Sequence, residues 1–284
     1  MEFMSFVADG LLMGFVYGVA AIGMSLIWGV MRVINLSHNV LIVSGMFGVY
    51  LLFNNLAMNP YLAIILMGIV GLLMGILIYA IALHRVINAP QLSTLLATFS
   101  VSMIMTGLAT AAWTTSPHNV EFSLGSISFG PVTFPITRLV AALVAVLAAG
   151  GLFLFLYRTR LGRYIRAVTN NRAAAEMVGV PSNQILALSF GLGAMIAAIS
   201  GGLIATFFPF NVLSGMNYQL KSFVVCVLGG LGNPLGALVG GLVLGTLEGV
   251  IPVFMETSWV PVFEFGLFVL IIIFRPSGLF GAKE

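Results

Sequence analysis

Residues 158–184 read RTRLGRYIRAVTNNRAAAEMVGVPSNQ and stand out from a chain that is otherwise mostly apolar. Within this stretch, Asn170 is placed to cap a short helix, the residues AAAEMV continue it, and Gly179 suits a left-handed ending before Pro181. A helix of about two turns is unstable alone in water. We therefore expect the segment either to be held by its flanks, as an ordinary positive-inside loop, or to dock on a cytoplasmic protein. The stretch holds five of the chain's eleven basic residues: Arg158, Arg160, Arg163, Arg166 and Arg172.

The composition indicates a membrane protein. Of 284 residues, 60% are hydrophobic and only 7% are charged, whereas soluble globular chains carry about 25% charged residues. The apolar runs are about 20 residues long, as in membrane-spanning helices, rather than alternating strands of about 10 residues. The net charge of +3 comes from basic residues near the ends of apolar runs, so it does not indicate nucleic acid as a partner. The single cysteine, Cys226, excludes an internal disulfide and a cysteine-based metal cluster.

The apolar runs predict an all-α integral membrane protein in which residues 1–284 form a single transmembrane domain. The run at residues 220–231 is too short to cross a bilayer, which takes about 20 residues, and another run follows it at once. We therefore expect about eight transmembrane helices plus one re-entrant or broken half-helix. The runs lie at residues 6–30, 40–56, 61–83, 92–113, 139–157, 185–207, 220–231, 235–251 and 259–274.

The basic residues predict the orientation, because cytoplasmic loops are rich in Lys and Arg. The N-terminus then lies outside and the C-terminus in the cytoplasm. Residues 114–137 also lie outside, and their β-forming residues among glycines and prolines favour a small hairpin. Because residues 185–207 end outside and the last run must end in the cytoplasm, the half-helix and the run after it must together leave and return on the same face of the membrane. The basic positions assigned to the cytoplasm are residues 158–184, Arg32, Arg85, Arg275 and Lys283.

Two interruptions of the apolar pattern, one in each half of the chain, predict the translocation pathway. They lie at residues 32–39 and 229–234. Unwound backbone is tolerated in a membrane only beside protein or water, and paired interruptions point to a site between the halves of a transporter. Two alternatives stay open: the first is a simple loop in which His38 only hydrogen-bonds the break, and the second is a tight glycine packing site. The pathway residues predicted here are Asn35, Ser37, His38, Asn39, Gly230, Gly232 and Asn233.

Motifs for catalysis and metal binding do not occur in the sequence. The two lysines, Lys221 and Lys283, do not follow the glycine of a nucleotide-binding P-loop, so the chain has no such loop with which to hydrolyse ATP. The three histidines, His38, His84 and His118, lie far apart, and no H-E-x-x-H pattern is found. The sequence therefore predicts no enzymatic activity, no catalytic residue, no metal ligand and no cofactor held by this chain.

Three acidic residues, Asp9, Glu248 and Glu264, lie inside or near apolar runs, where an ionised side chain usually has a function. No Lys or Arg lies in the same runs at helical spacing to pair with them. We expect these carboxylates to lie near the outer surface in contact with water. The alternative is a buried proton relay in a proton-coupled carrier.

Four motifs, taken in order along the chain, resemble those of branched-chain amino acid permeases of the ABC importer type. The resemblance is to the smaller of the two permease subunits and covers essentially the full length. Each motif alone is a weak signal, whereas the four in order are a strong one. The sequence departs from the family pattern at Asn39, which follows His38 where the family usually has glycine. A different residue beside the pathway would change the local turn or the substrate preference. The motifs are AIG at 21–23 with VINLSH at 33–38; GR at 162–163, RAV at 166–168, Asn170, Arg172, AAE at 174–176 and GV at 179–180; VLGGLGNPLGA at 227–237; and RPSGLFG at 275–281.

The resemblance implies a permease subunit of an ATP-driven importer in the bacterial cytoplasmic (inner) membrane. Residues 170–179 would form a coupling helix in a groove of a cytoplasmic ATPase, and a periplasmic binding protein would deliver branched-chain amino acids. Two ATPase subunits would bind ATP and Mg, and the lipid bilayer would surround this chain and a second permease subunit, homologous or identical. The residues implied in ATPase coupling are Arg163, Arg166, Asn170, Arg172, Ala174, Glu176 and Gly179.

Alternative functions stay open at this point. Related permeases move urea, short amides or other small organic solutes. A different class is an ATP-independent secondary carrier that uses the two interruptions as its site. Such a carrier would not need a capped cytoplasmic helix, so residues 158–184 favour the importer.

Overall fold

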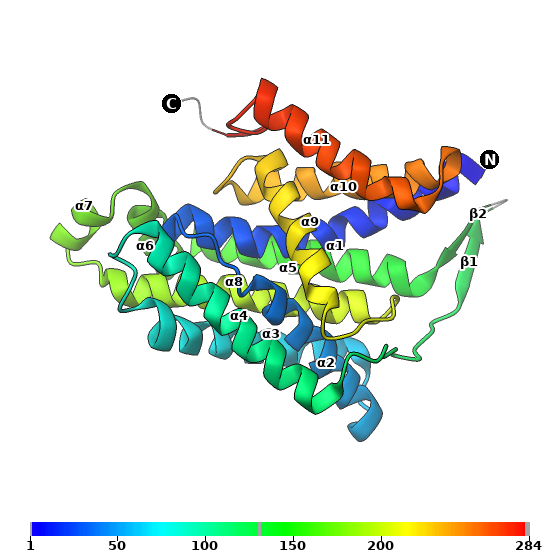
Figure 1. The fold of residues 1–284 in the computed structure, drawn as a ribbon, viewed down its shortest axis with the longest axis horizontal. Helices are drawn as coiled ribbons and strands as arrows, with labels where there is room; N and C mark the ends of the chain where they lie inside the picture. The colour runs from blue at the N-terminus through cyan, green and yellow to red at the C-terminus, as the bar shows by residue number, and fades with distance from the viewer. Residues whose placement is uncertain (1, 130–131, 282–284) are drawn as a thin grey trace.

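The computed structural model describes residues 2–129 and 132–281, which form a predominantly helical bundle (Figure 1). Eight helical segments of the described chain are long and apolar enough to cross a membrane, so the prediction of an all-α membrane protein is confirmed. Gly130, Pro131 and Lys283 lie outside the described residues. The elements are α1 (Glu2–Met31), α2 (His38–Leu56), α3 (Pro60–Ile78) with a π-helical turn (Tyr79–Leu83), α4 (Gln91–Trp113), β1 (Ser126–Phe129), β2 (Val132–Pro135), α5 (Ile136–Arg158), α6 (Arg160–Asn170), α7 (Arg172–Met177), α8 (Ser182–Ala205), α9 (Ser214–Gly229), α10 (Pro234–Phe254), a 3₁₀ turn (Thr257–Trp259) and α11 (Val260–Phe274).

Helices α1 and α8 form the centre of the bundle. In their most apolar stretches, 83% of α1 and 78% of α8 are buried, against 11% for α4 and α11. Helix α8 packs on α1, α2 and α3, whereas α4 and α11 lie at the periphery with mainly apolar side chains exposed. Helix α9 has 16 residues, fewer than the roughly 20 needed for a full span, as predicted for the half-helix.

Glycines allow α1 and α10 to meet backbone to backbone. A Cβ atom on Gly10 would lie 2.4 Å from the carbonyl oxygen of Gly245, and one on Gly241 would lie 2.4 Å from the Cα of Gly18. No larger residue fits at such separations without moving a helix. Small residues at helix contacts are a common basis of packing inside membranes, where the hydrophobic effect does not drive helices together.

The two ends of the bundle differ in what they carry (Figure 1). One end carries the N-terminus and the antiparallel hairpin of β1 and β2, in which Ser126 pairs with Pro135. The predicted hairpin is therefore confirmed. The other end carries α6, α7, the turn between α9 and α10, and the C-terminal tail. Which of these ends faces the cytoplasm stays a prediction.

The first interruption folds back beside the middle of α1. Helix α1 ends at Met31, residues 32–37 are not helical, and α2 begins at His38, so the break ends two residues earlier than predicted. The His38 Nε2 atom lies 3.1 Å from the carbonyl oxygen of Ala20, which at 1.5 Å per residue is about 16 Å back along α1 from its end. The residues before α2 therefore lie inside the bundle.

The second interruption is a tight turn near the end of α1. Residues 230–233 separate α9 from α10, as predicted, and Gly230 and Gly232 have φ angles of 103° and 81°, which favour glycine. The Asn233 side chain caps α10 by accepting its first backbone N–H groups. A Cβ atom on Gly29 would lie 3.2 Å from the Cα of Gly232, so the turn contacts the last turns of α1. Both predicted interruptions are present, but they lie at different depths.

Candidate functional site

The arginine-rich stretch contains two helices, α6 and α7, whereas the sequence predicted only one, at residues 170–179. Gly162, Ile165 and Val168 are buried at three-residue spacing, whereas Arg163 and Arg166 are exposed. That spacing is the signal of an amphipathic helix that was available in the sequence. Helix α6 therefore packs along the bundle and directs arginines outward.

Helix α7 begins one residue later than predicted, and the expectation that Asn170 is its N-cap is wrong. Asn171 is the N-cap, since its Oδ1 atom accepts the N–H of Ala174 at 3.0 Å. Asn170 is instead the last residue of α6. The two adjacent asparagines are equally suitable as N-cap residues. Because α6 extends through Asn170, Asn171 is the one left to cap α7. Gly179 has a φ of 84°, the left-handed ending expected there.

Arg172 ties α7 to the rest of the bundle. Its Nε donates to Glu176 Oε1 at 3.0 Å, its Nη1 to Asn88 Oδ1 at 3.1 Å and its Nη2 to Asn183 Oδ1 at 3.3 Å. The Ser182 hydroxyl and the Arg172 guanidinium lower the pKa of the Glu176 carboxyl. Because this pKa lies below its ordinary value, the stabilisation is present above the ordinary value and is lost as pH falls through the lowered one.

The tip of α7 presents apolar side chains to solvent. Met177 is 83% exposed and Val178, which follows it, is 80% exposed. Fully burying a side chain of this size contributes about 1.5–3 kcal/mol. Ala175 is buried beneath them and Ala174 is half-buried. The segment is therefore anchored on one side and leaves an unburied apolar tip on the other.

Helix α6 also reaches the second interruption. The guanidinium carbon of Arg166 lies 4.9 Å from the ring centroid of Tyr157 on α5, a cation–π contact. Arg166 lines a small cavity of about 140 Å³ together with Gly29 at the end of α1 and Gly232 in the turn. The arginine-rich segment and the turn between α9 and α10 are thus neighbours at one end of the bundle.

The residues of the first interruption form a buried polar turn. The Oδ1 atom of Asn35 accepts the backbone N–H of Ser37 at 3.0 Å and its hydroxyl at 2.6 Å. The backbone N–H of Leu36 donates to Thr98 Oγ1 on α4 at 3.2 Å. These bonds replace helical ones in a buried segment, where an unpaired backbone group is costly. Asn35 Nδ2 and His38 Nδ1 have no hydrogen-bond partner among the described residues.

Asn39 joins three helices at the start of α2. Its backbone N–H donates to Gln219 Oε1 on α9 at 3.0 Å, and its Oδ1 accepts the hydroxyl of Ser102 on α4 at 2.9 Å. The structure therefore keeps the four predicted residues of the first interruption in one buried turn, which is bonded to α1 through His38 and to α4 through Leu36 and Asn39. Gln219 was not predicted, because it lies before the short apolar run and belongs to none of the motifs or interruptions.

The predicted residues of the second interruption are not part of this cluster. The Asn233 Nδ2 atom donates to the Phe280 carbonyl at 3.0 Å, and the Phe280 N–H donates to the Gly229 carbonyl at 3.2 Å. A Cβ atom on Gly230 would lie 2.7 Å from the backbone of Gly281. The turn is thus packed against the C-terminal tail. Its role in transport stays a prediction, as does that of the first interruption.

The acidic residues of the spans are paired with cations, and Glu264 is buried, contrary to the expectation that it lies in contact with water near the outer surface. Asp9 on α1 forms an ion pair with Arg138 on α5. Lys221 on α9 pairs with Glu248 on α10, and its Nζ lies 3.5 Å from Glu264 on α11, whose side chain is only 5% exposed. The expectation considered partners within one helix only, whereas every cation here comes from another helix.

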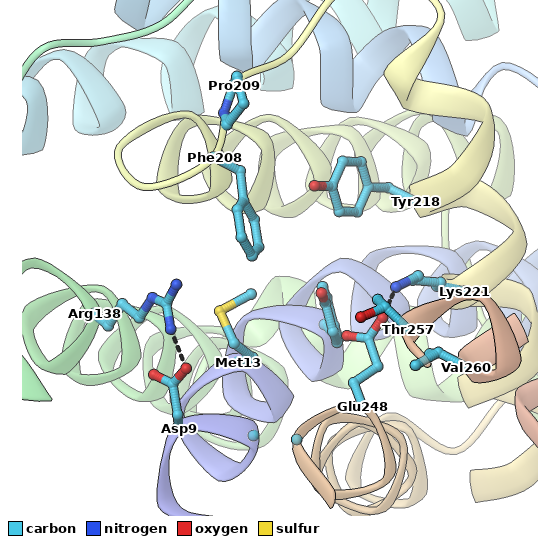
Figure 2. Close-up of a pocket in the computed structure, with 13 residues that line it drawn as sticks. Asp9, Met13, Arg138, Phe208, Pro209, Tyr218, Lys221, Glu248, Thr257 and Val260 are labelled. Atoms are coloured by element: carbon cyan, nitrogen blue, oxygen red, sulfur yellow. Dashed lines mark hydrogen bonds and ion pairs between the residues drawn. The ribbon is translucent and has the colours of Figure 1, made fainter. Parts of the chain in front are cut away.

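Four of these charged residues, Asp9, Arg138, Lys221 and Glu248, line a cavity of about 440 Å³ (Figure 2). The guanidinium carbon of Arg138 lies 5.6 Å from the ring centroid of Phe208, and Lys221 Nζ lies 4.9 Å from that of Tyr17. The cavity thus combines full charges with aromatic and apolar surface. It is lined by Asp9, Gly10, Met13, Tyr17, Arg138, Phe208, Pro209, Tyr218, Lys221, Glu248, Gly249, Thr257 and Val260.

Comparison with known proteins gives full-length relatives. The chain is 28% identical to the high-affinity branched-chain amino acid transport system permease protein BraD of Pseudomonas aeruginosa, over 97% of this chain and 95% of the relative. It is 26% identical to the corresponding protein LivH of Escherichia coli (strain K12), over 97% and 94%. The fold is similar to a chain of PsaBC from Streptococcus pneumoniae in complex with Fab, with a TM-score of 0.50, 12% identity and coverage of 97% and 94%.

The family described as the branched-chain amino acid transport system / permease component matches residues 6–272. The match takes in the charged cavity, the arginine-rich helices and the turn before α10, and it ends before the C-terminal tail. The chain belongs to this permease family.

Proposed function

We propose that this chain is the transmembrane permease subunit of an ATP-driven importer of branched-chain, apolar amino acids. ATP and Mg are bound by two cytoplasmic ATPase subunits, a periplasmic binding protein delivers the substrate, and a second permease subunit completes the pathway. Family membership supports the transport class. The two relatives named above are permease proteins of branched-chain amino acid transport systems, which supports the substrate class.

The arginine-rich segment carries the proposal of an ATPase partner. Its anchored face is fixed by Arg172 and by the buried residues of α6, while Met177 and Val178 are left exposed at the tip of α7. An apolar tip on a rigid base, outside the apolar spans, suits insertion into a groove of another protein. Exposed Arg163 and Arg166 suit pairing with acidic residues around that groove.

The proposal is tested by purifying the tagged chain from native membranes in mild detergent. We expect P-loop ATPases to co-purify with the wild type and to be lost with the double substitution Met177→Glu/Val178→Glu. The matched control is Leu161→Glu, which changes an exposed apolar residue at the other end of the segment, 44% exposed, and should retain the ATPases. In proteoliposomes, leucine uptake should require ATP and the binding protein.

Two results would contradict the proposal. The first is a chain that purifies without ATPases yet moves leucine in vesicles that lack ATP, which would favour a secondary carrier. The second is ATP-dependent uptake of urea or a short amide in preference to leucine, which would retain the importer and replace the substrate.

A further inference from the structure

The charged cavity has an ion pair on each of two sides and apolar groups between them (Figure 2). Asp9 and Arg138 stand on one side, and Lys221 and Glu248 on the other. Its volume of about 440 Å³ is in the range of small-molecule sites, about 300–1,000 Å³. The groups between the two pairs include Met13 and Phe208.

The pair formed by Asp9 and Arg138 has unused hydrogen-bonding capacity. Asp9 engages Arg138 through Oδ2 only, and its Oδ1 atom is buried with no partner among the described residues. Arg138 engages Asp9 through Nη1, and a guanidinium has five N–H donors in a fork that matches a carboxylate. The two side chains, 33% and 23% exposed, can therefore each accept a further charged partner.

The opposite side of the cavity is occupied by its own contacts. Lys221 pairs with Glu248 and Glu264 and lies against the ring of Tyr17. The lysine is therefore already engaged by protein groups and forms part of the wall rather than a free binding group. The residues that line the cavity include two carboxylates, Asp9 and Glu248, and two cations, Arg138 and Lys221, so the lining is neutral overall. Such a lining suits a ligand that carries both charges better than a free anion or a free cation.

We propose that this cavity binds the zwitterionic backbone of an α-amino acid, with Asp9 accepting from its ammonium group and Arg138 donating to its carboxylate. The apolar side chain of the amino acid lies between the two ion pairs, against Met13 and Phe208. The proposal rests on the proposed function, because it assigns the place where a transported amino acid is held within this subunit. Neither a neutral sugar nor a fatty acid presents both charges.

A cysteine in the cavity tests the binding directly. Thr257 lines the cavity and its neighbour Ser258 does not, although both are exposed. The native Cys226 is fully buried, so it contributes little labelling. In the purified importer without binding protein, we expect leucine to slow maleimide labelling of Thr257→Cys and to leave the matched control Ser258→Cys unchanged. Leucinamide, which lacks the carboxylate, and 4-methylpentanoate, which lacks the ammonium group, should not protect at the same concentration.

The double substitution Asp9→Asn/Arg138→Gln removes both charges at once and leaves neither unpaired. In the Thr257→Cys background it should raise the half-protecting leucine concentration about tenfold or more, because a hydrogen bond to a charged group contributes roughly that factor. Unchanged labelling of Ser258→Cys and unchanged ATPase recovery show that the variant folds. If it does not fold, Arg138→Lys, which keeps the charge and loses the fork, should weaken protection instead.

The proposal is overturned if leucine gives no protection, if the two analogues protect as well as leucine, or if the charge-free variant is protected like the wild type. These outcomes are read in an importer that still co-purifies with ATPases and takes up leucine only with ATP. Failure of the proposed function has a different signature, namely loss of that ATP dependence or of the ATPases in the wild type.

Discussion

Lys221 is the residue on which most of the intramembrane charge depends. It pairs with Glu248 and lies 3.5 Å from Glu264, and its own side chain is 22% exposed. Removing one partner from a buried network leaves the others uncompensated, which costs roughly 3–5 kcal/mol. Replacing the whole network by neutral groups costs far less, since no charge is then left without a partner.

We therefore expect Lys221→Met to lower the free energy of unfolding by about 3 kcal/mol. The triple variant Lys221→Met/Glu248→Gln/Glu264→Gln should recover most of that loss. Thermal unfolding of the detergent-purified chain, followed by light scattering or tryptophan fluorescence, measures both. A triple variant that is no more stable than Lys221→Met would show that the lysine contributes by packing rather than by pairing.

The pairing of these charges could not be read from the sequence. Asp9 and Arg138 are 129 positions apart, and Lys221 and Glu248 are 27 positions apart on different helices. Periodicity reports which residues share a face of one helix, but it does not report which helices are neighbours. The acidic residues themselves were recognisable as unusual, because an ionised group in an apolar run needs a partner or water.

At the scale of elements, the arginine-rich segment shows what local chemistry can predict. A short helix ending at Gly179 follows from capping and glycine preferences alone, and it is present. The start of that helix differs by one residue, because α6 was not anticipated and ends at Asn170. The Arg172 contacts with Asn88 and Asn183 depend on the bundle and have no local signal.

The adjacent asparagines offer a sharp test of the cap. Asn171→Ala should destabilise α7 by about 1 kcal/mol, the usual cost of losing an N-cap, and speed amide hydrogen exchange there about fivefold. Asn170→Ala should have little effect on α7, since its side chain is not the cap. Hydrogen exchange with mass spectrometry on residues 172–177 measures the difference. Equal effects of the two substitutions would contradict the assigned cap.

At the scale of the whole molecule, the spans and the two interruptions were predictable and their depths were not. The first interruption runs from the end of α1 back to its middle, where His38 meets Ala20, whereas residues 230–233 lie near the end of α1 and contact the tail. Length and hydropathy show that a run is broken. They do not show where the break lies along a neighbouring helix, which depends on packing.

The orientation of the molecule can be tested with exposed cysteine positions. Ser258 and Leu161 are both exposed, and the basic residues predict that they lie on opposite sides of the membrane. A membrane-impermeant maleimide should label Ser258→Cys in intact spheroplasts, and Leu161→Cys only in inverted vesicles. The reverse pattern would overturn the predicted placement of the N-terminus outside.

The glycine contact between α1 and α10 restricts how this subunit can change shape. At Gly10, Gly14, Gly241 and Gly245 the two backbones are in contact and leave few side chains to repack. We therefore expect α1 and α10 to move as one rigid body rather than to slide past each other by shear. We expect rotation during a transport cycle to use hinges at the borders of this pair, and the non-helical residues 32–37 and 230–233 are the candidates that the chain provides there.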